Sequence, residues 1–149
     1  MLFRSVIITC LIVVCIFSTI SVSSAAANQY YQFYLSNTGR EYNVYEEHNN
    51  TKIIKYDKGT VNTSYNNTPG WGMAFCLKYR YYQNGSYNWV TATITSPGLW
   101  ISGADTKYLT YVNENDSYLR PHYVAARIDD DYSGYYYCEG VFNADKTYP

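Results

Sequence analysis

Residues 71–96 read WGMAFCLKYRYYQNGSYNWVTATITS, and this stretch decides the fold that the rest of the chain must fit. Asn84 and Gly85 separate two runs in which apolar and polar side chains alternate. An Asn-Gly pair between two such runs is the strongest short-range signal for a β-hairpin closed by a type I′ turn. We therefore expect an antiparallel hairpin whose loop is these two residues.

The turn also fixes which residues of the two strands face each other, because Gln83 must pair with Ser86. Counting back from that pair predicts an apolar face that packs into the core. This inward face contains Met73, Phe75, Leu77, Tyr79, Val90, Ala92 and Ile94. The opposite, outward face contains Cys76, Arg80, Tyr82, Tyr87 and Trp89. In this register Arg80 lies opposite Trp89, and Tyr82 lies opposite Tyr87.

The N-terminus has the pattern of a secretory signal peptide. Arg4 precedes an apolar run at residues 6–17, and a segment of small residues ends at Ala27. This order is typical of a cleaved segment, and the apolar run is shorter than the roughly 20 residues that a membrane-spanning helix needs. We expect a signal peptide over residues 1–27, a secreted mature chain with no membrane span, and one domain over residues 28–149. A retained membrane anchor is the alternative.

Short alternating runs separated by turn residues continue through the mature chain. Residues 41–46 and 51–56 are expected to pair as two strands, and residues 132–142 to form the last strand. No window after the signal peptide has the 3.6-residue apolar period of a helix. All 20 tyrosines follow the signal peptide, and tyrosine favours strands. The sequence predicts an all-β fold, a single antiparallel β-sandwich of about eight strands.

Cys76 and Cys138 are the two cysteines outside the signal peptide. An even pair of cysteines in an exported chain predicts one disulfide. Because Cys76 is on the outward face of the hairpin, the bond should join two strands on that same face. The simplest partner strand is the C-terminal one, residues 132–142.

No catalytic or metal-binding motif is present. His48 and His122 are the only histidines, and we expect both in loops or on the surface. Residues 129–134, DDDYSG, begin like a calcium loop, but Gly140 stands where a bidentate Glu is required. With 11 basic and 12 acidic residues, the chain has no charge excess that favours nucleic acid. We predict no enzyme activity, no metal, no cofactor and no nucleic-acid partner.

The outward face of the hairpin is the candidate binding site. Arg80, Tyr82, Tyr87 and Trp89 are predicted to form an exposed patch held by a cation–π contact and a cross-strand aromatic pair. Such a patch favours a binding or surface-interaction module whose partner is a cell-surface polysaccharide or another protein. In the alternative interpretation, the same pairs only stabilise the hairpin.

One resemblance is to an immunoglobulin domain. Residues 132–138, YSGYYYC, resemble the Asp-x-Gly-x-Tyr-x-Cys signature of that family. Cys76 lies 62 residues before Cys138, and Trp89 follows Cys76 by 13 residues, which is close to the immunoglobulin spacing. The resemblance implies a recognition domain in which core-facing cysteines flank a buried Trp89.

A second resemblance covers residues 62–145. An Asn/Thr-rich loop, an aromatic strand, and a tail that runs from ARID at 126–129 to EGVFN at 139–143 carry it. In this order the chain resembles small exported, Tyr-rich β domains of Gram-positive bacteria, which have no assigned function and are sometimes compared with bacteriocins. The resemblance implies export and β structure, with a bacteriocin-like antimicrobial effector as an alternative function.

Overall fold

The predicted hairpin is present in the computed structural model of the protein, as strands β5 (Met73–Gln83) and β6 (Ser86–Thr91). The structure describes residues 27–36, 41–95, 99–128 and 133–145. Asn84 and Gly85 have φ angles of 53° and 81°, the left-handed pair that a type I′ turn requires. Gln83 pairs with Ser86 and Arg80 with Trp89, so the predicted register is confirmed.

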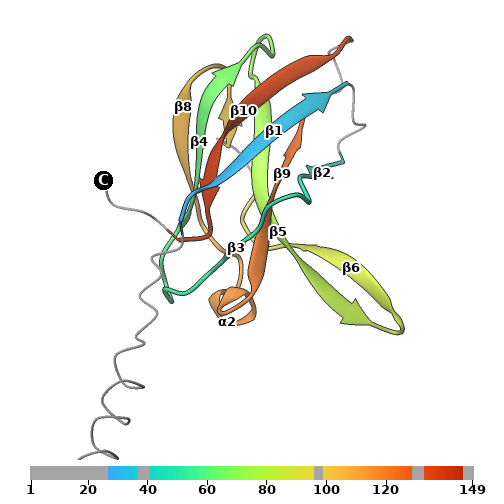
Figure 1. Ribbon diagram of the computed structural model, residues 1–149, viewed down its shortest axis with the longest axis vertical. Helices are drawn as coiled ribbons and strands as arrows, with labels where there is room; N and C mark the ends of the chain where they lie inside the picture. Colours follow the sequence, from blue (N-terminus) through green and yellow to red (C-terminus); the bar gives the residue numbers. More distant parts are fainter. Residues whose placement is uncertain (1–26, 37–40, 96–98, 129–132, 146–149) are drawn as a thin grey trace, which may run out of the picture.

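The strands form two antiparallel sheets, which confirms the all-β prediction (Figure 1). One sheet has the order β1-β10-β4-β8, and the other has the order β2-β9-β5-β6, with β3 beside β9 and β7 beside β5. The other elements are β1 (Gln29–Leu35), β2 (Asn43–Val44), β3 (Asn50–Thr51), β4 (Gly59–Asn66), β7 (Trp100–Ile101), β8 (Asp105–Leu109), α2 (Glu114–Ser117), β9 (Pro121–Arg127) and β10 (Tyr136–Asn143).

Side chains from both sheets share one hydrophobic core. Alternate residues of β1 are buried, and the rings of Tyr31 and Phe33 lie 5.6 and 6.3 Å from the ring of Phe75 on β5. This aromatic contact links the first strand of one sheet to the central strand of the other. From the hairpin, Met73, Phe75, Leu77, Tyr79 and Ala92 are buried as predicted, and Val90 is partly buried against the core.

Ile94 is not part of this core, and its predicted inward position is wrong. Its side chain is 46% exposed. The reason is that β6 ends at Thr91 and the chain then leaves β5 and pairs with the segment at residues 110–111. Thr93 forms a bridge with Tyr111, and the backbone N–H of Ile94 donates to Thr110 at 2.9 Å. Near the start of β5, the short strand β7 takes the place that a continuation of β6 would occupy.

The predicted pairing of residues 41–46 with residues 51–56 is also wrong. The first run contains the short strand β2, and the second shares only Thr51 with β3; both strands pair with β9. The two strands therefore cover successive parts of one edge of β9, while β5 covers the other edge. Pro121 is tolerated in this central strand because it is the first residue of β9.

Candidate binding surface on the hairpin

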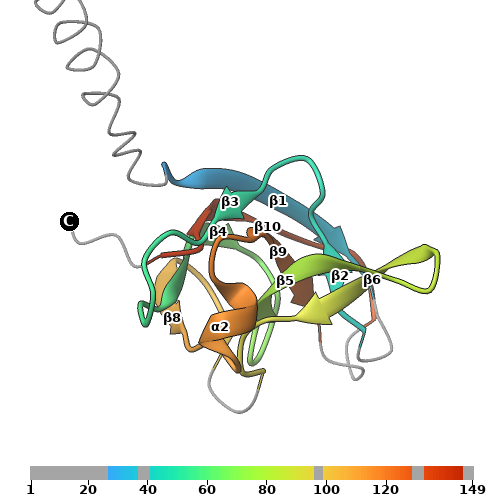
Figure 2. The same ribbon diagram turned by 90° about the horizontal axis from the view of Figure 1, so that it is seen from below.

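The far half of the hairpin extends beyond its sheet. On the side of β5 away from β6, pairing with β9 ends at Lys78, so the later residues of β5 have only β6 beside them. All residues from Arg80 to Asn88 are exposed. Figures 1 and 2 both show this two-stranded ribbon projecting from the body of the molecule. Its side chains are therefore accessible on both faces.

Arg80 and Trp89 form the base of the ribbon. The guanidinium of Arg80 lies 4.8 Å from the centre of the Trp89 indole and 5.9 Å from the Tyr123 ring. Trp89 meets Tyr123 edge to face at 5.2 Å, and Arg80 also forms an ion pair with Glu46. The predicted Arg80–Trp89 stack is present, and two partners from other elements hold it in place.

Tyr82 and Tyr87 lie nearer the tip. Their rings meet at 4.9 Å and 61°, and the side chains are 59% and 69% exposed. Tyr81, on the opposite face of the ribbon, is 41% exposed and lies 5.7 Å from the guanidinium of Arg120. The predicted patch therefore divides into a packed base and an exposed tip.

The rest of this outer sheet face was not predicted from the sequence. Arg127 lies between the rings of Trp100 and Tyr42, at 5.0 and 5.4 Å, and Lys78 lies 5.7 Å from the Tyr42 ring. Cations and aromatic rings thus alternate across β5, β9 and their neighbours. Period-2 alternation in residues 121–127 could have indicated that Tyr123 and Arg127 share the outward face with Arg80.

The predicted disulfide is not present, because Cys76 and Cys138 are both free thiols. Cys76 faces outward on β5, as predicted, but is fully buried there. Cys138 lies on β10, which belongs to the other sheet, and its side chain belongs to the core. The two thiols therefore lie on different sheets and face different sides. Burial raises the pKa of each thiol to about 12.

The residues that carry the immunoglobulin resemblance are not brought together in this structure. Only Cys138 of the two cysteines belongs to the core, and Trp89 is half-buried on the outer face. That arrangement lacks the pair of core-facing cysteines around a buried Trp that the resemblance implies.

A buried polar cluster lies beside α2 and the start of β9. The ammonium of Lys52, which is fully buried, donates to the carbonyl of Asp57 at 2.6 Å and lies 3.4 Å from Glu114 and 3.5 Å from Asp145. It also lies 4.1 Å from the centre of the Tyr111 ring. This cluster could not be predicted from the sequence, because its members come from three segments that are far apart along the chain.

His122 belongs to the same region, and its predicted surface position is wrong. It is fully buried on β9, with its ring edge to face against Tyr79 at 5.8 Å and Tyr111 at 5.3 Å. Nδ1 lies 2.9 Å from the carbonyl of Arg120, and Nε2 has no hydrogen-bond partner among the described residues. Burial lowers the pKa of His122 to about 4. His48, in contrast, is exposed as predicted.

The described part of the chain shows no group of three His, Cys, Asp or Glu side chains that could hold a metal ion. Within the same residues, no helix is long and apolar enough to cross a bilayer. The acidic residues 129–131 and the proposed signal segment up to residue 26 lie outside the described residues.

Comparison with known proteins adds no relative. No protein-family model, curated protein or solved structure matches the chain.

Proposed function

We propose that the protein is an exported, non-enzymatic binding module, an antiparallel β-sandwich that contacts a partner protein through the tip of its hairpin. The observation that carries the proposal is the projecting ribbon, in which residues 81–88, YYQNGSYN, carry no charge and are all exposed. The signal-peptide pattern before Asn28 supports export.

The composition of the tip favours protein recognition. Tyrosine, serine, glycine and asparagine are the residues that antibody binding loops use most. Tyrosine gives a large, amphipathic contact area with only two side-chain torsions to fix, while serine and asparagine supply adaptable hydrogen bonds. Tyr81, Tyr82 and Tyr87 provide that area on both faces of the ribbon.

The packed base prepares the tip for binding. An isolated two-stranded hairpin is marginally stable in water. Here the stack of Arg80, Trp89 and Tyr123 and the ion pair with Glu46 fix the strands where they leave the sheet. A ribbon that is already ordered loses less entropy on binding, which increases affinity.

The test measures binding of fluorescently labelled protein to intact Gram-positive bacteria by flow cytometry. Tyrosines at the centre of an interface are frequent hot spots. The double variant Tyr82→Ala/Tyr87→Ala should therefore weaken binding by at least about tenfold. Tyr56→Ala, which removes a 77% exposed tyrosine away from the hairpin, should bind like the wild type.

Shaving the cells with protease before the measurement should remove the binding that depends on the tip, because the proposed partner is a protein. The proposal is wrong if the double variant binds as well as the wild type, or if tip-dependent binding survives the protease.

A further inference from the structure

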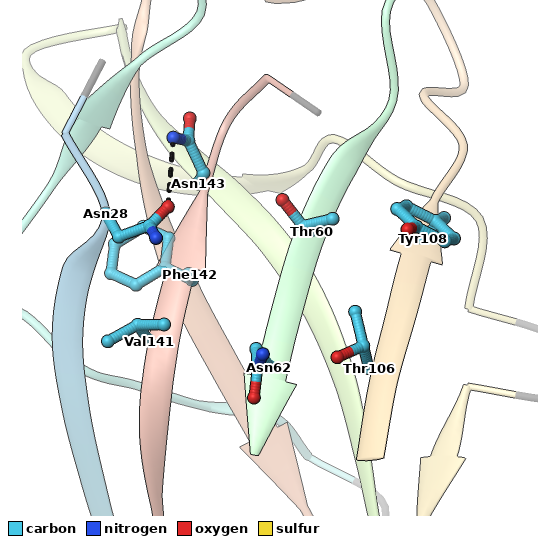
Figure 3. Close-up of a pocket in the computed structure, with 8 residues that line it drawn as sticks. All are labelled: Asn28, Thr60, Asn62, Thr106, Tyr108, Val141, Phe142 and Asn143. Carbon is cyan, nitrogen blue, oxygen red and sulfur yellow. Dashed lines mark hydrogen bonds between the residues drawn. The ribbon is translucent and has the colours of Figure 1, made fainter. Parts of the chain in front are cut away.

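The outer face of the other sheet contains a hollow of about 330 Å³ (Figure 3). Among its lining residues are Asn28, Thr60, Asn62, Thr106, Tyr108 and Val141. This volume is at the small end of the range for small-molecule sites, ~300–1,000 Å³. Strands β4, β8 and β10 supply most of the lining, so the hollow is built on a sheet rather than on loops.

The lining of the hollow combines polar and apolar side chains and includes no charged residue. Asn28, Asn62 and Asn143 contribute amides, and Asn143 donates to the amide oxygen of Asn28 at 3.3 Å. Thr60 and Thr106 contribute hydroxyls. Amides and hydroxyls both donate and accept hydrogen bonds, as the hydroxyls of a sugar do. Tyr108 and Val141 add apolar surface, which suits the C–H face of a sugar ring.

A row of tyrosines extends from the hollow over the same face. We use the name tyrosine row for Tyr30, Tyr34, Tyr65 and Tyr137. The ring of Tyr137 lies 4.6 Å from the Tyr34 ring and 5.9 Å from the Tyr65 ring. The hydroxyls of Tyr30 and Tyr137 both donate to the carboxylate of Glu139, and these hydrogen bonds lower its pKa. The row is thus ordered by side-chain contacts while Tyr34 remains 71% exposed.

Residues paired across neighbouring strands connect the tyrosine row to the hollow. Tyr30 pairs with Val141, Val141 pairs with Asn62, and Asn62 pairs with Thr106. Neighbouring strands lie about 4.8 Å apart, so this line spans roughly 14 Å from the tyrosine row to the far side of the hollow. That length suits a chain of several sugar units better than one free monosaccharide.

We propose that this face binds a neutral polysaccharide, with one sugar in the hollow against Tyr108 and the following sugars on the tyrosine row. Charge favours a neutral chain. The described residues of β1, β10, β4 and β8 that point outward include Glu139 and no Lys or Arg, so on these four strands an acidic polymer or a nucleic acid would meet repulsion and no compensating cation. The site is on the opposite sheet from the hairpin and does not depend on the proposed protein contact.

The test titrates the purified protein by calorimetry with neutral hexasaccharides built from glucose, xylose, mannose or N-acetylglucosamine, and with polygalacturonate as an acidic probe. At least one neutral hexasaccharide should bind. Tyr108→Ala should weaken its binding by about tenfold, and Tyr34→Ala by several-fold, since each removes an aromatic contact. Tyr108→Phe should keep most of the affinity because the ring is retained. Tyr82→Ala on the hairpin is the matched control and should bind normally.

The proposal is overturned if no neutral hexasaccharide binds at millimolar concentration, or if polygalacturonate binds better than all of them. It is also overturned if Tyr108→Ala and Tyr34→Ala both leave the affinity unchanged. Circular dichroism should show that both variants are folded, as expected for tyrosines that are 47% and 71% exposed. If Tyr108→Ala does not fold, the affinity of Tyr34→Ala alone decides whether the proposal is correct.

Discussion

At the scale of single residues, His122 gives the fold a dependence on pH. Its ring is fully buried between Tyr79 and Tyr111, and burial is the main reason that its pKa is lowered from 6.5 to about 4. The positive charges of Lys52 and Arg120 lower the pKa further, while the hydrogen bond to the Arg120 carbonyl raises it. The folded protein therefore favours the neutral ring.

The free energy of unfolding should fall as the pH falls from about 6.5 to about 4. In that window the unfolded chain takes up a proton on His122 and the folded chain does not. The stability that comes from the neutral His122 ring is fully present above pH 6.5. Since the pKa is lowered from 6.5 to about 4, the free energy of unfolding should decrease by about 3 kcal/mol as the pH falls through this window. Urea unfolding at several pH values measures it.

The matched variant is His122→Phe, which keeps an aromatic ring against both tyrosines. Its unfolding free energy should change less over the same pH window, because phenylalanine takes up no proton. Carboxylates that titrate near pH 4 contribute equally to both proteins. Parallel curves for the wild type and the variant would contradict the assignment.

Local register made some residue contacts predictable. Arg80 and Trp89 are nine residues apart around a defined turn, so their stack follows from the sequence of the hairpin alone. Tyr123 and Glu46, which complete the base, come from elements whose position the sequence did not determine. The buried position of His122 was missed for the same reason.

At the scale of elements, the strand β10 depends on Gly140. The register between β10 and β4 shifts between Glu139 and Gly140, and a Cβ atom at Gly140 would lie 2.1 Å from the carbonyl oxygen of Asn62. This backbone oxygen cannot move aside as the end of a flexible side chain can. Close approach of two backbones is a common reason for glycine inside a strand.

Gly140→Ala should therefore lower the free energy of unfolding by about 3 kcal/mol or more, measured by urea denaturation. Gly85→Ala is the control. Gly85 has a φ of 81° but no atom within 4 Å of the added Cβ, so the cost should be only the ~1–2 kcal/mol of a left-handed backbone. Equal losses in the two variants would show that the strands do not approach as closely as described.

The strands themselves were easier to predict than the strands with which they pair. Alternation and turn residues located the hairpin and β10 in the sequence, because these signals are local. The sheet to which β10 belongs is decided by contacts with β1 and β4, each more than 70 residues away in sequence. The disulfide prediction failed at this step, since it placed Cys138 beside Cys76 on one face.

At the scale of the whole molecule, the two sheets present different surfaces. One sheet continues into the tip of the hairpin, where Tyr81, Tyr82 and Tyr87 are exposed. The other carries the hollow and the tyrosine row on its outer face. The sequence predicted an aromatic binding surface but placed it on the hairpin alone, because only the hairpin had a register that could be read locally.

The most direct test of the proposed binding function compares three proteins on intact and protease-shaved Gram-positive cells by flow cytometry. These are the wild type, Tyr82→Ala/Tyr87→Ala and Tyr108→Ala. We predict that the tip variant loses the protease-sensitive binding and that Tyr108→Ala loses the binding that survives shaving. If neither variant changes either component, the two surfaces are not binding surfaces, and the account of the function is wrong.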